Sequence, residues 1–165
     1  MSLPLLASNP GFSPASRVWV YVANRRLNDA EAGFVQDQLN AFVVQWTAHN
    51  QALQAAAEVY DHQALILMVD ETQAGASGCS IDKSVHFLEA LGREVDADFF
   101  ERMRFGWADE AGALHWAGRA EMASLVQDGR VRADTQVLNT LVQTQAELAE
   151  KWFLPFEKSW HKRLF

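Results

Sequence analysis

The first regular element that the hydrophobic pattern predicts is a strand at residues 17–23. The segment reads RVWVYVA, in which Val18, Val20 and Val22 alternate with Trp19 and Tyr21. β-Branched and aromatic side chains on both faces are typical of a strand that is covered on both sides, or nearly so. We therefore expect the fold to begin with a strand inside a sheet.

A helix is predicted to follow and to end near Thr47. Asn28 stands before it and Glu31 three residues later, which is a variant of the capping-box pattern. Apolar residues then recur at i, i+4, i+7 and i+11, as they do on one face of a helix with 3.6 residues per turn. These residues are Val35, Leu39, Phe42 and Trp46.

Two more strands and a second helix are predicted in the middle of the chain. Residues 52–60 are rich in alanine, and residues 64–70, ALILMVD, form an apolar run that is too short for a buried helix and fits a central strand. Because these runs are so close together, we expect a hairpin. The small residues of segment 73–84 then lead into a helix with an apolar period over residues 81–91, and Gly92 fits its C-terminal stop.

The order of these elements predicts an α+β fold with a ferredoxin-like core. A last pair of strands is expected at residues 103–108 and 113–116, turning through residues 109–112. Through the first strand of this pair the order is β-α-β-β-α-β, which is the split βαβ arrangement with an antiparallel sheet.

The domain organisation follows from the same patterns. Residues 1–16 hold three of the four prolines and several serines, which predicts a flexible N-terminal arm outside the fold. Residues 17–165 are expected to form a single domain, with a core at 17–110 and a C-terminal extension at 111–165. The extension is predicted to be mostly helical. Its helical patterns lie at 118–127 and 145–153.

Composition and charge narrow the classes of partner. The 165 residues are 49% hydrophobic, which is enough to build a core, and 14 Lys and Arg against 21 Asp and Glu give a net charge of −7. Such a chain repels phosphate backbones, so nucleic acid is not an expected partner. It has no run of eighteen apolar residues and no basic leader followed by an apolar block, which predicts no membrane partner and a cytoplasmic location.

The cysteine and histidine content gives no support for a metal or cofactor site. Cys79 is the single cysteine, so neither an intramolecular disulfide nor a zinc site with two thiolates is expected. The five histidines include no i, i+4 pair, and the chain has no dinucleotide fingerprint. We therefore predict no metal and no cofactor.

The predicted topology brings three polar segments to one end of the sheet. They are the end of the first helix near residues 47–50, the end of the third strand at 70–71, and the start of the second helix at 77–82. Glycine and serine residues at a helix start can hold an anion, so we expect a small anionic metabolite to bind here. The residues expected to form this site are His49, Asp70, Glu71, Ser77, Gly78, Cys79, Ser80 and Asp82.

Two other interpretations of this segment stay open. In the first, the serines and glycines serve only to cap the helix and let the chain turn, which is their more common use. The carboxylates of Asp70, Glu71 and Asp82 disfavour a phosphate and could instead bind a divalent cation. An ordinary P-loop ATPase is not supported, because that motif requires glycine where Ser77 and Asp82 stand.

Thiol chemistry at Cys79 is a further hypothesis. Cys79 lies off the apolar stripe in the first turn of the helix, where the helix dipole and Lys83 favour a reactive thiolate and Asp82 opposes it. A Cys-His couple could form with His49 or His86, and with Asp70 or Glu71 to orient the histidine. The alternative is that Cys79 is a small buried hydrophobic residue.

The C-terminal tail suggests an interaction function without catalysis. Aromatic residues in WFLPFEKSWHKRLF, residues 152–165, are interleaved with Lys, His and Arg side chains. Such a tail, or the antiparallel sheet, could bind a protein partner or a second copy of the chain, which makes a scaffold module or homodimer the main alternative. The competing interpretation is a terminal helix that packs its rings on the sheet and leaves its cations in water.

Three segments resemble a known group of bacterial proteins. They are VDETQAGASGCSIDKSVHFL, QWTAHN and the terminal SWHKRLF, and the similarity runs from about Arg17 to Phe165. The group is uncharacterised and often carries the automatic label "ABC transporter ATPase". Because the glycines of a phosphate loop are missing here, the resemblance implies kinship with that group and not ATP hydrolysis, and it carries no catalytic residues to this chain.

Overall fold

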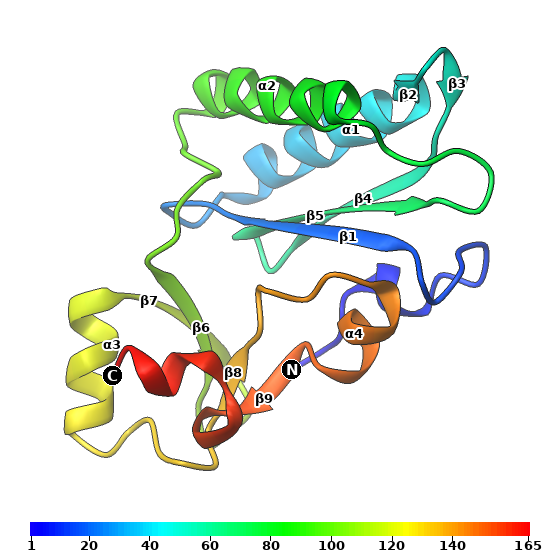
Figure 1. Ribbon diagram of the computed structural model, residues 1–165. Coiled ribbons are helices and arrows are strands. Elements are labelled where there is room, and N and C mark those ends of the chain that lie inside the picture. Colours follow the sequence, from blue (N-terminus) through cyan, green and yellow to red (C-terminus); the bar gives the residue numbers. More distant parts are fainter.

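The computed structural model describes residues 1–165 and is a mixed α+β fold with antiparallel sheets (Figure 1). Its central sheet has the strand order β1-β5-β4, from β1 (Arg17–Val22), β5 (Ala64–Asp70) and β4 (Gln54–Tyr60). All seven residues of β5 are buried, as expected for an apolar run at the centre of a sheet. The strands and the hairpin predicted in these segments are confirmed.

Two helices cover one face of the central sheet (Figure 1). They are α1 (Asp29–Gln45) and α2 (Gly78–Val95), and the short hairpin of β2 (Thr47–Ala48) and β3 (Gln51–Ala52) follows α1. The predicted capping box is present, because Asn28 Oδ1 accepts the N–H of Glu31, and Glu31 accepts the N–H of Asn28. No helix of the protein combines the length and the apolar character that crossing a bilayer requires.

The opposite face of the central sheet is covered by the N-terminal segment and by residues 138–152. The N-terminal segment, for which the sequence predicts a flexible arm, forms the 3-10 helix η1 (Leu5–Ser8) and buries Leu6 and Ala7 against the sheet. The carboxylate of Glu58 on β4 accepts the backbone N–H groups of Leu5 and Leu6, both at 2.9 Å. Burial raises the pKa of Glu58, and these two hydrogen bonds act against that rise. Proline removes backbone donors but does not prevent a segment from packing through its apolar residues.

The strand expected to be the fourth of the central sheet belongs to a second sheet. This sheet has the order β7-β6-β8-β9, from β6 (Arg104–Ala108), β7 (Leu114–Gly118), β8 (Gln136–Leu138) and β9 (Phe153–Pro155). The predicted hairpin of β6 and β7 is present, but the four-stranded ferredoxin-like sheet is not formed. The second sheet has its own apolar core, and Phe105 and Trp107 of β6 are buried in it rather than beside β1.

The C-terminal extension is less helical than its pattern predicts. It contains α3 (Arg119–Gln127), α4 (Gln145–Glu150) and the 3-10 helices η2 (Phe156–Lys158) and η3 (Trp160–Arg163), together with β7, β8 and β9. The helix predicted to reach Phe153 stops at Glu150, because the next residues pair with β8. Pro155 is tolerated there since β9 is an edge strand.

Helix α2 also continues beyond its predicted stop. Gly92 lies inside the helix, which ends at Val95, and Asp96 adopts the left-handed conformation (φ 54°) that closes it. The chain then folds back so closely that a methyl group on Gly92 would lie 2.5 Å from the carbonyl oxygen of Ala97. Gly92 is therefore required for a close approach and not for its own backbone conformation.

We expect Gly92→Ala to destabilise the protein by about 1–3 kcal/mol, because the added methyl group collides with backbone that cannot rotate away. Gly33→Ala is the matched control: it is also a glycine inside a helix, and nothing lies within 4 Å of the added methyl group. That control should stabilise the protein by about 0.5–1 kcal/mol. Urea unfolding of both variants measures the difference, and equal effects would contradict this account of Gly92.

Candidate functional site

The start of α2, where the sequence predicts an anion site, is occupied by its own capping hydrogen bonds. Ser77 is the N-cap, and its hydroxyl oxygen accepts the N–H of Ser80 at 3.1 Å. The Ser80 hydroxyl oxygen accepts the N–H of Ser77 at 2.6 Å and donates to the Ser77 carbonyl at 2.8 Å. Ser80 is almost fully buried. These groups already satisfy one another, as in a capping box.

The two acidic residues after β5 hold the neighbouring loops. Asp70 accepts the backbone N–H groups of Ser13 at 2.9 Å and Thr72 at 3.0 Å. The N–H of Ser13, more than that of Thr72, holds the pKa of the Asp70 carboxyl below its usual value. Glu71 accepts the N–H of Ala76 at 2.8 Å. Both carboxylates therefore fix the path of the chain into α2.

The cysteine and the two histidines considered for thiol chemistry are spread over the surface. Cys79 is exposed, as its place off the apolar stripe predicts. His86 is seven residues further along α2, which places it about 10 Å away along the helix axis. His49 is exposed in the turn between β2 and β3, with φ 51°. Asp82 and Gly78 are exposed as well.

The predicted segments do lie at the same end of the central sheet. The hairpin of β2 and β3, the loop after β5 and the start of α2 are all at the right of Figure 1. The indole N–H of Trp46 donates to the carbonyl of Ser80 at 2.8 Å and joins the ends of the two helices. Of the predicted residues, Glu71 lines a surface hollow, but it does so with β1 and residues 141–144 and not with the start of α2. Anion binding and thiol chemistry at residues 73–84 thus stay predictions.

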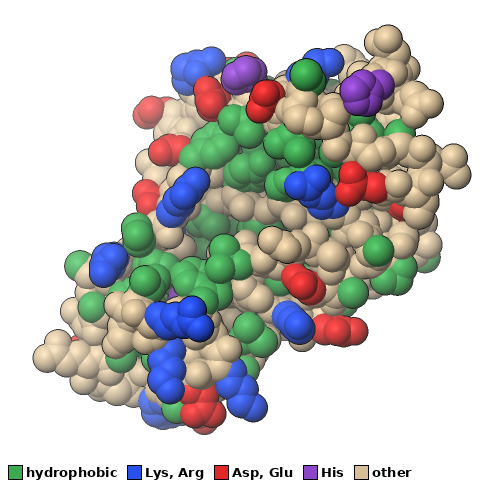
Figure 2. All heavy atoms as spheres, viewed as in Figure 1, with side chains coloured by type: hydrophobic (Ala, Val, Ile, Leu, Met, Phe, Trp, Pro, Cys, Tyr) green, Lys and Arg blue, Asp and Glu red, His purple; other side chains and the backbone are tan.

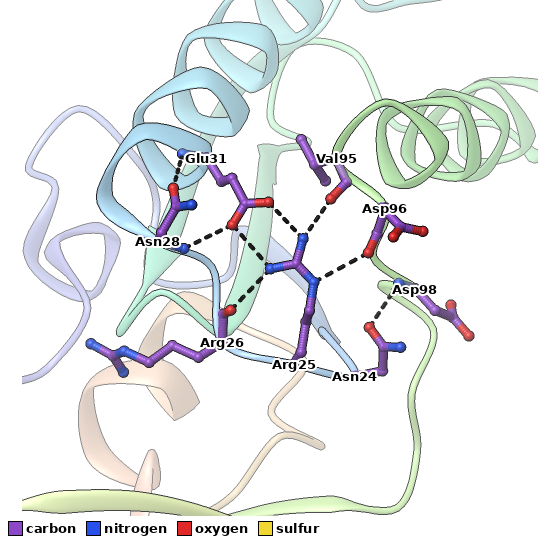
Figure 3. Close-up of polar contacts among 8 residues, drawn as sticks. All are labelled: Asn24, Arg25, Arg26, Asn28, Glu31, Val95, Asp96 and Asp98. Carbon is purple, nitrogen blue, oxygen red and sulfur yellow. Dashed lines mark hydrogen bonds and ion pairs between the residues drawn. The ribbon is translucent and has the colours of Figure 1, made fainter.

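A second polar cluster, at the opposite ends of the helices, surrounds Arg25 (Figure 3). The guanidinium group donates to both carboxylate oxygens of Glu31, at 3.0 and 2.6 Å, and to the carbonyls of Val95 and Asp96 at 2.5 and 3.2 Å. It therefore ties the start of α1 to the end of α2, where a cation is favoured by the helix dipole. The hydrogen bonds from Arg25, and after them the one from the Asn28 N–H, lower the pKa of Glu31 to about 2. All of these groups are engaged within the chain, so the cluster serves the fold.

The free edge of β1 differs from both polar clusters because it has unused hydrogen-bonding groups. The Val18 N–H donates outward to the carbonyl of Gln143 at 2.9 Å, and the Val22 carbonyl accepts the N–H of Glu101 at 3.1 Å. In an antiparallel ladder the outward direction recurs at every second residue, so the N–H and C=O of Val20 also point away from β5. No group of the chain forms a hydrogen bond with either of them.

The chain itself closes both ends of this edge. At the start of β1, residues Arg17 and Thr144 form an antiparallel bridge, and at its end Val22 and Phe100 form a parallel one. The open stretch from Val18 to Val22 covers four residue steps, which is about 13 Å of strand.

A groove, called the β1 groove below, runs along the open edge. It consists of two hollows of about 430 and 360 Å³ that adjoin at Val20 and Leu141. Figure 2 shows the β1 groove between the half of the molecule that holds the central sheet and the half that holds the second sheet, with hydrophobic side chains above and below the groove. Residues that line it from the strand and the facing loops are Arg17, Val18, Trp19, Val20, Tyr21, Val22, Phe100, Thr140, Leu141 and Val142.

The two walls of the β1 groove have different characters. Trp19 and Tyr21 project toward the helices and pack against the core beneath α1 and α2. The opposite wall comes from the second half of the chain and includes Leu141, which is 62% exposed, and Trp160 of the C-terminal tail. Large apolar residues along a groove that also offers free backbone groups are typical of a binding surface.

The sequence does not reveal this groove. The alternation in residues 17–23 predicts a strand that is covered on both sides. The aromatic and basic pattern of residues 152–165 suggests an interaction element but does not show where on the fold it lies. The groove exists because β6 leaves the position beside β1, which only the three-dimensional pairing shows.

Comparison of the chain with protein-family models, with curated proteins and with solved structures finds no match. The resemblance to the bacterial group described above therefore stays a prediction.

The capping box at the start of α2 predicts that Ser77→Ala destabilises the protein by about 1 kcal/mol, because the helix loses the acceptor for the Ser80 N–H. Thermal unfolding measures the loss, and Cys79→Ser, an exposed change in the same turn, should have almost no effect. The same scans with added phosphate separate capping from anion binding. If phosphate stabilises the wild type but not Ser77→Ala, the helix start binds an anion, and the capping account is incomplete.

The Arg25 cluster predicts a pH-dependent contribution to stability. The pKa of Glu31 is lowered from 4.5 to about 2, so its contribution is complete above pH 4.5 and is lost as the pH falls toward 2. Glu31→Gln should therefore be less stable than the wild type near neutral pH, and the difference should shrink through this window. Denaturant unfolding at several pH values tests it. Asp37→Asn, an exposed change on α1 outside the cluster, is the control, and a Glu31→Gln difference that does not change with pH would contradict the role of Arg25.

Proposed function

We propose that this chain is a protein-interaction module that binds a short, extended peptide segment of another protein in the β1 groove. The observation that carries the proposal is the unpaired backbone of Val20 at the open edge of β1. An edge strand with free N–H and C=O groups can pair with an added strand, and this is a common mode of peptide recognition.

The position of the free edge supports a strand as the occupant. In a split βαβ core the fourth strand lies beside the first. In this protein the central sheet has the order β1-β5-β4, so the side of β1 away from β5 has no strand of the chain along it. The chain after α2 reaches this position at Phe100 and then turns away into β6. A guest strand beside β1 would take the place that the ferredoxin-like arrangement gives to its fourth strand.

The closed ends of the edge favour a short peptide over a second copy of the chain. Two β1 strands paired across a twofold axis would need the whole edge of each copy. Residues 98–101 and 143–145 already occupy both ends of it. About 13 Å between them leaves room for three or four residues of an extended segment.

The side chains of the bound peptide would then contact the two walls of the groove. Side chains of an extended peptide alternate between two sides. One side would meet Trp19 and Tyr21, and the other would meet Leu141 and Trp160. Backbone pairing supplies affinity in this mode, and the pockets for alternate side chains supply specificity.

Selection of random heptapeptides displayed on phage, with the intact chain as bait, tests the proposal. We expect enriched sequences whose binding depends on Val20. Val20→Pro removes the outward N–H, and because this N–H does not pair with β5, the strand should tolerate the change. It should weaken the binding of an enriched peptide at least tenfold in fluorescence anisotropy. Leu141→Glu changes an exposed side chain at the centre of the groove and should weaken binding as well.

Two controls keep the result interpretable. Val44→Glu introduces the same charge at an exposed apolar residue on α1 and should leave binding unchanged. Hydrogen exchange should show that the Val20 amide becomes protected when the peptide binds. The proposal fails if no sequence is enriched, or if enriched peptides bind both groove variants as well as they bind the wild type.

A further inference from the structure

The β1 groove carries arginine side chains that have no acidic partner. Arg17 lines one hollow, and Arg102 and Arg104 line the other. The arginines that do form ion pairs, Arg25, Arg26 and Arg132, are located elsewhere. The chain as a whole has 21 acidic residues against 14 basic ones, whereas the lining of this groove has three arginines against two glutamates, Glu71 and Glu101.

The two ends of the groove differ in the contacts that their arginine side chains make within the chain. The guanidinium group of Arg17 lies over the ring of Trp19, 4.7 Å from its centre, and Glu71 lines the same hollow. At the other end, Arg102 is exposed, and the side chain of Arg104 forms no hydrogen bond. The nearby carboxylate of Glu101 accepts the N–H of Met103 at 2.8 Å. Glu101 lines this second hollow, so two arginines face one carboxylate here, whereas one arginine faces one carboxylate at the other end. The excess of positive charge is therefore at the Arg102 and Arg104 end.

Arg104 is the more constrained of these two residues. It is half-buried, and its Nε has no hydrogen-bond partner. A buried donor without an acceptor is costly, so an acceptor that approaches this guanidinium group gains from satisfying it. Guanidinium groups bind carboxylates by two parallel hydrogen bonds, which makes a carboxylate the fitting acceptor.

We propose that the peptide segment carries an acidic side chain, Asp or Glu, that binds to Arg102 and Arg104 beside the end of β1. This inference rests on the proposed function and adds the chemistry of the ligand to it. Arg102 and Arg104 share their hollow with Leu141 and Trp160, so the acidic residue would point to that wall of the groove. Its neighbours in the peptide would point to Trp19 and Tyr21, and apolar residues suit those positions.

The peptides enriched by the intact chain provide the test. We expect an acidic residue at one fixed position with apolar residues beside it. Exchanging that residue for Asn or Gln in a synthetic peptide should lower the affinity for the wild type about tenfold, as the loss of a charge-assisted pair does. The same exchange should have almost no effect on binding to a chain with Arg102→Gln and Arg104→Gln. Added salt should weaken the acidic peptide and spare the neutral one.

Further variants separate the possible outcomes. Arg102→Gln alone alters an exposed side chain and is informative even if the Arg104 variant fails to fold. Arg119→Gln, an exposed arginine on α3 outside the groove, is the matched control. Enriched peptides without an acidic position, or an exchange to Asn or Gln that costs nothing, would overturn this inference, while sensitivity to Val20→Pro would keep the proposed function. Absence of any enriched peptide would overturn the proposed function itself.

Discussion

The complete burial of β5 is the constraint on which the rest of the structure depends. Seven consecutive residues from Ala64 to Asp70 are buried, and the strand has a neighbour on each side. Such a strand is stable only if both faces of its sheet are covered, since every apolar side chain left in water costs free energy. The helices α1 and α2 cover one face, and the N-terminal segment and residues 138–152 cover the other. The N-terminal residues are held there by the buried carboxylate of Glu58, although they carry little regular structure.

The second sheet follows from the same need to bury apolar segments. β6 has four buried residues, and a position at the edge of the central sheet would leave part of it without cover. In the second sheet it lies between β7 and β8 and shares a core with α3 and the C-terminal tail. The consequence is that β1 keeps an edge that neither half of the chain fills. Natural proteins usually block such edges, and here the chain blocks only the two ends.

The polar groups of this protein fall into two classes that matter for function. Those at the start of α2 and around Arg25 are numerous, but they hydrogen-bond to one another and hold the helices in place. Those at the β1 groove are few, but Val20 and the nearby arginines lack partners within the chain. Clusters of polar residues are easily noticed in a sequence, whereas binding capacity depends on which of their hydrogen bonds remain unused. This difference favours the edge of β1 over residues 73–84 as the place where the protein binds a partner.

The sequence by itself determined the local elements. The alternation in residues 17–23, the Asn28 capping signal and the apolar run of residues 64–70 are local patterns, and each forms the element that it predicts. The sequence pattern also places Cys79 off the apolar face of its helix, and Cys79 is exposed. It places the start of α2 at the end of the sheet where the structure has it. Only the tertiary structure decided which strands pair, whether the serines of α2 are free, and where the N-terminal residues lie. These outcomes depend on contacts between residues far apart in the chain, and a segment such as β6 satisfies the same local pattern beside β1 or beside β8. The free energy of burying β6 against the rest of the chain decides between these two positions, and no local pattern contains that free energy. Because β6 pairs in the second sheet, the edge of β1 stays open.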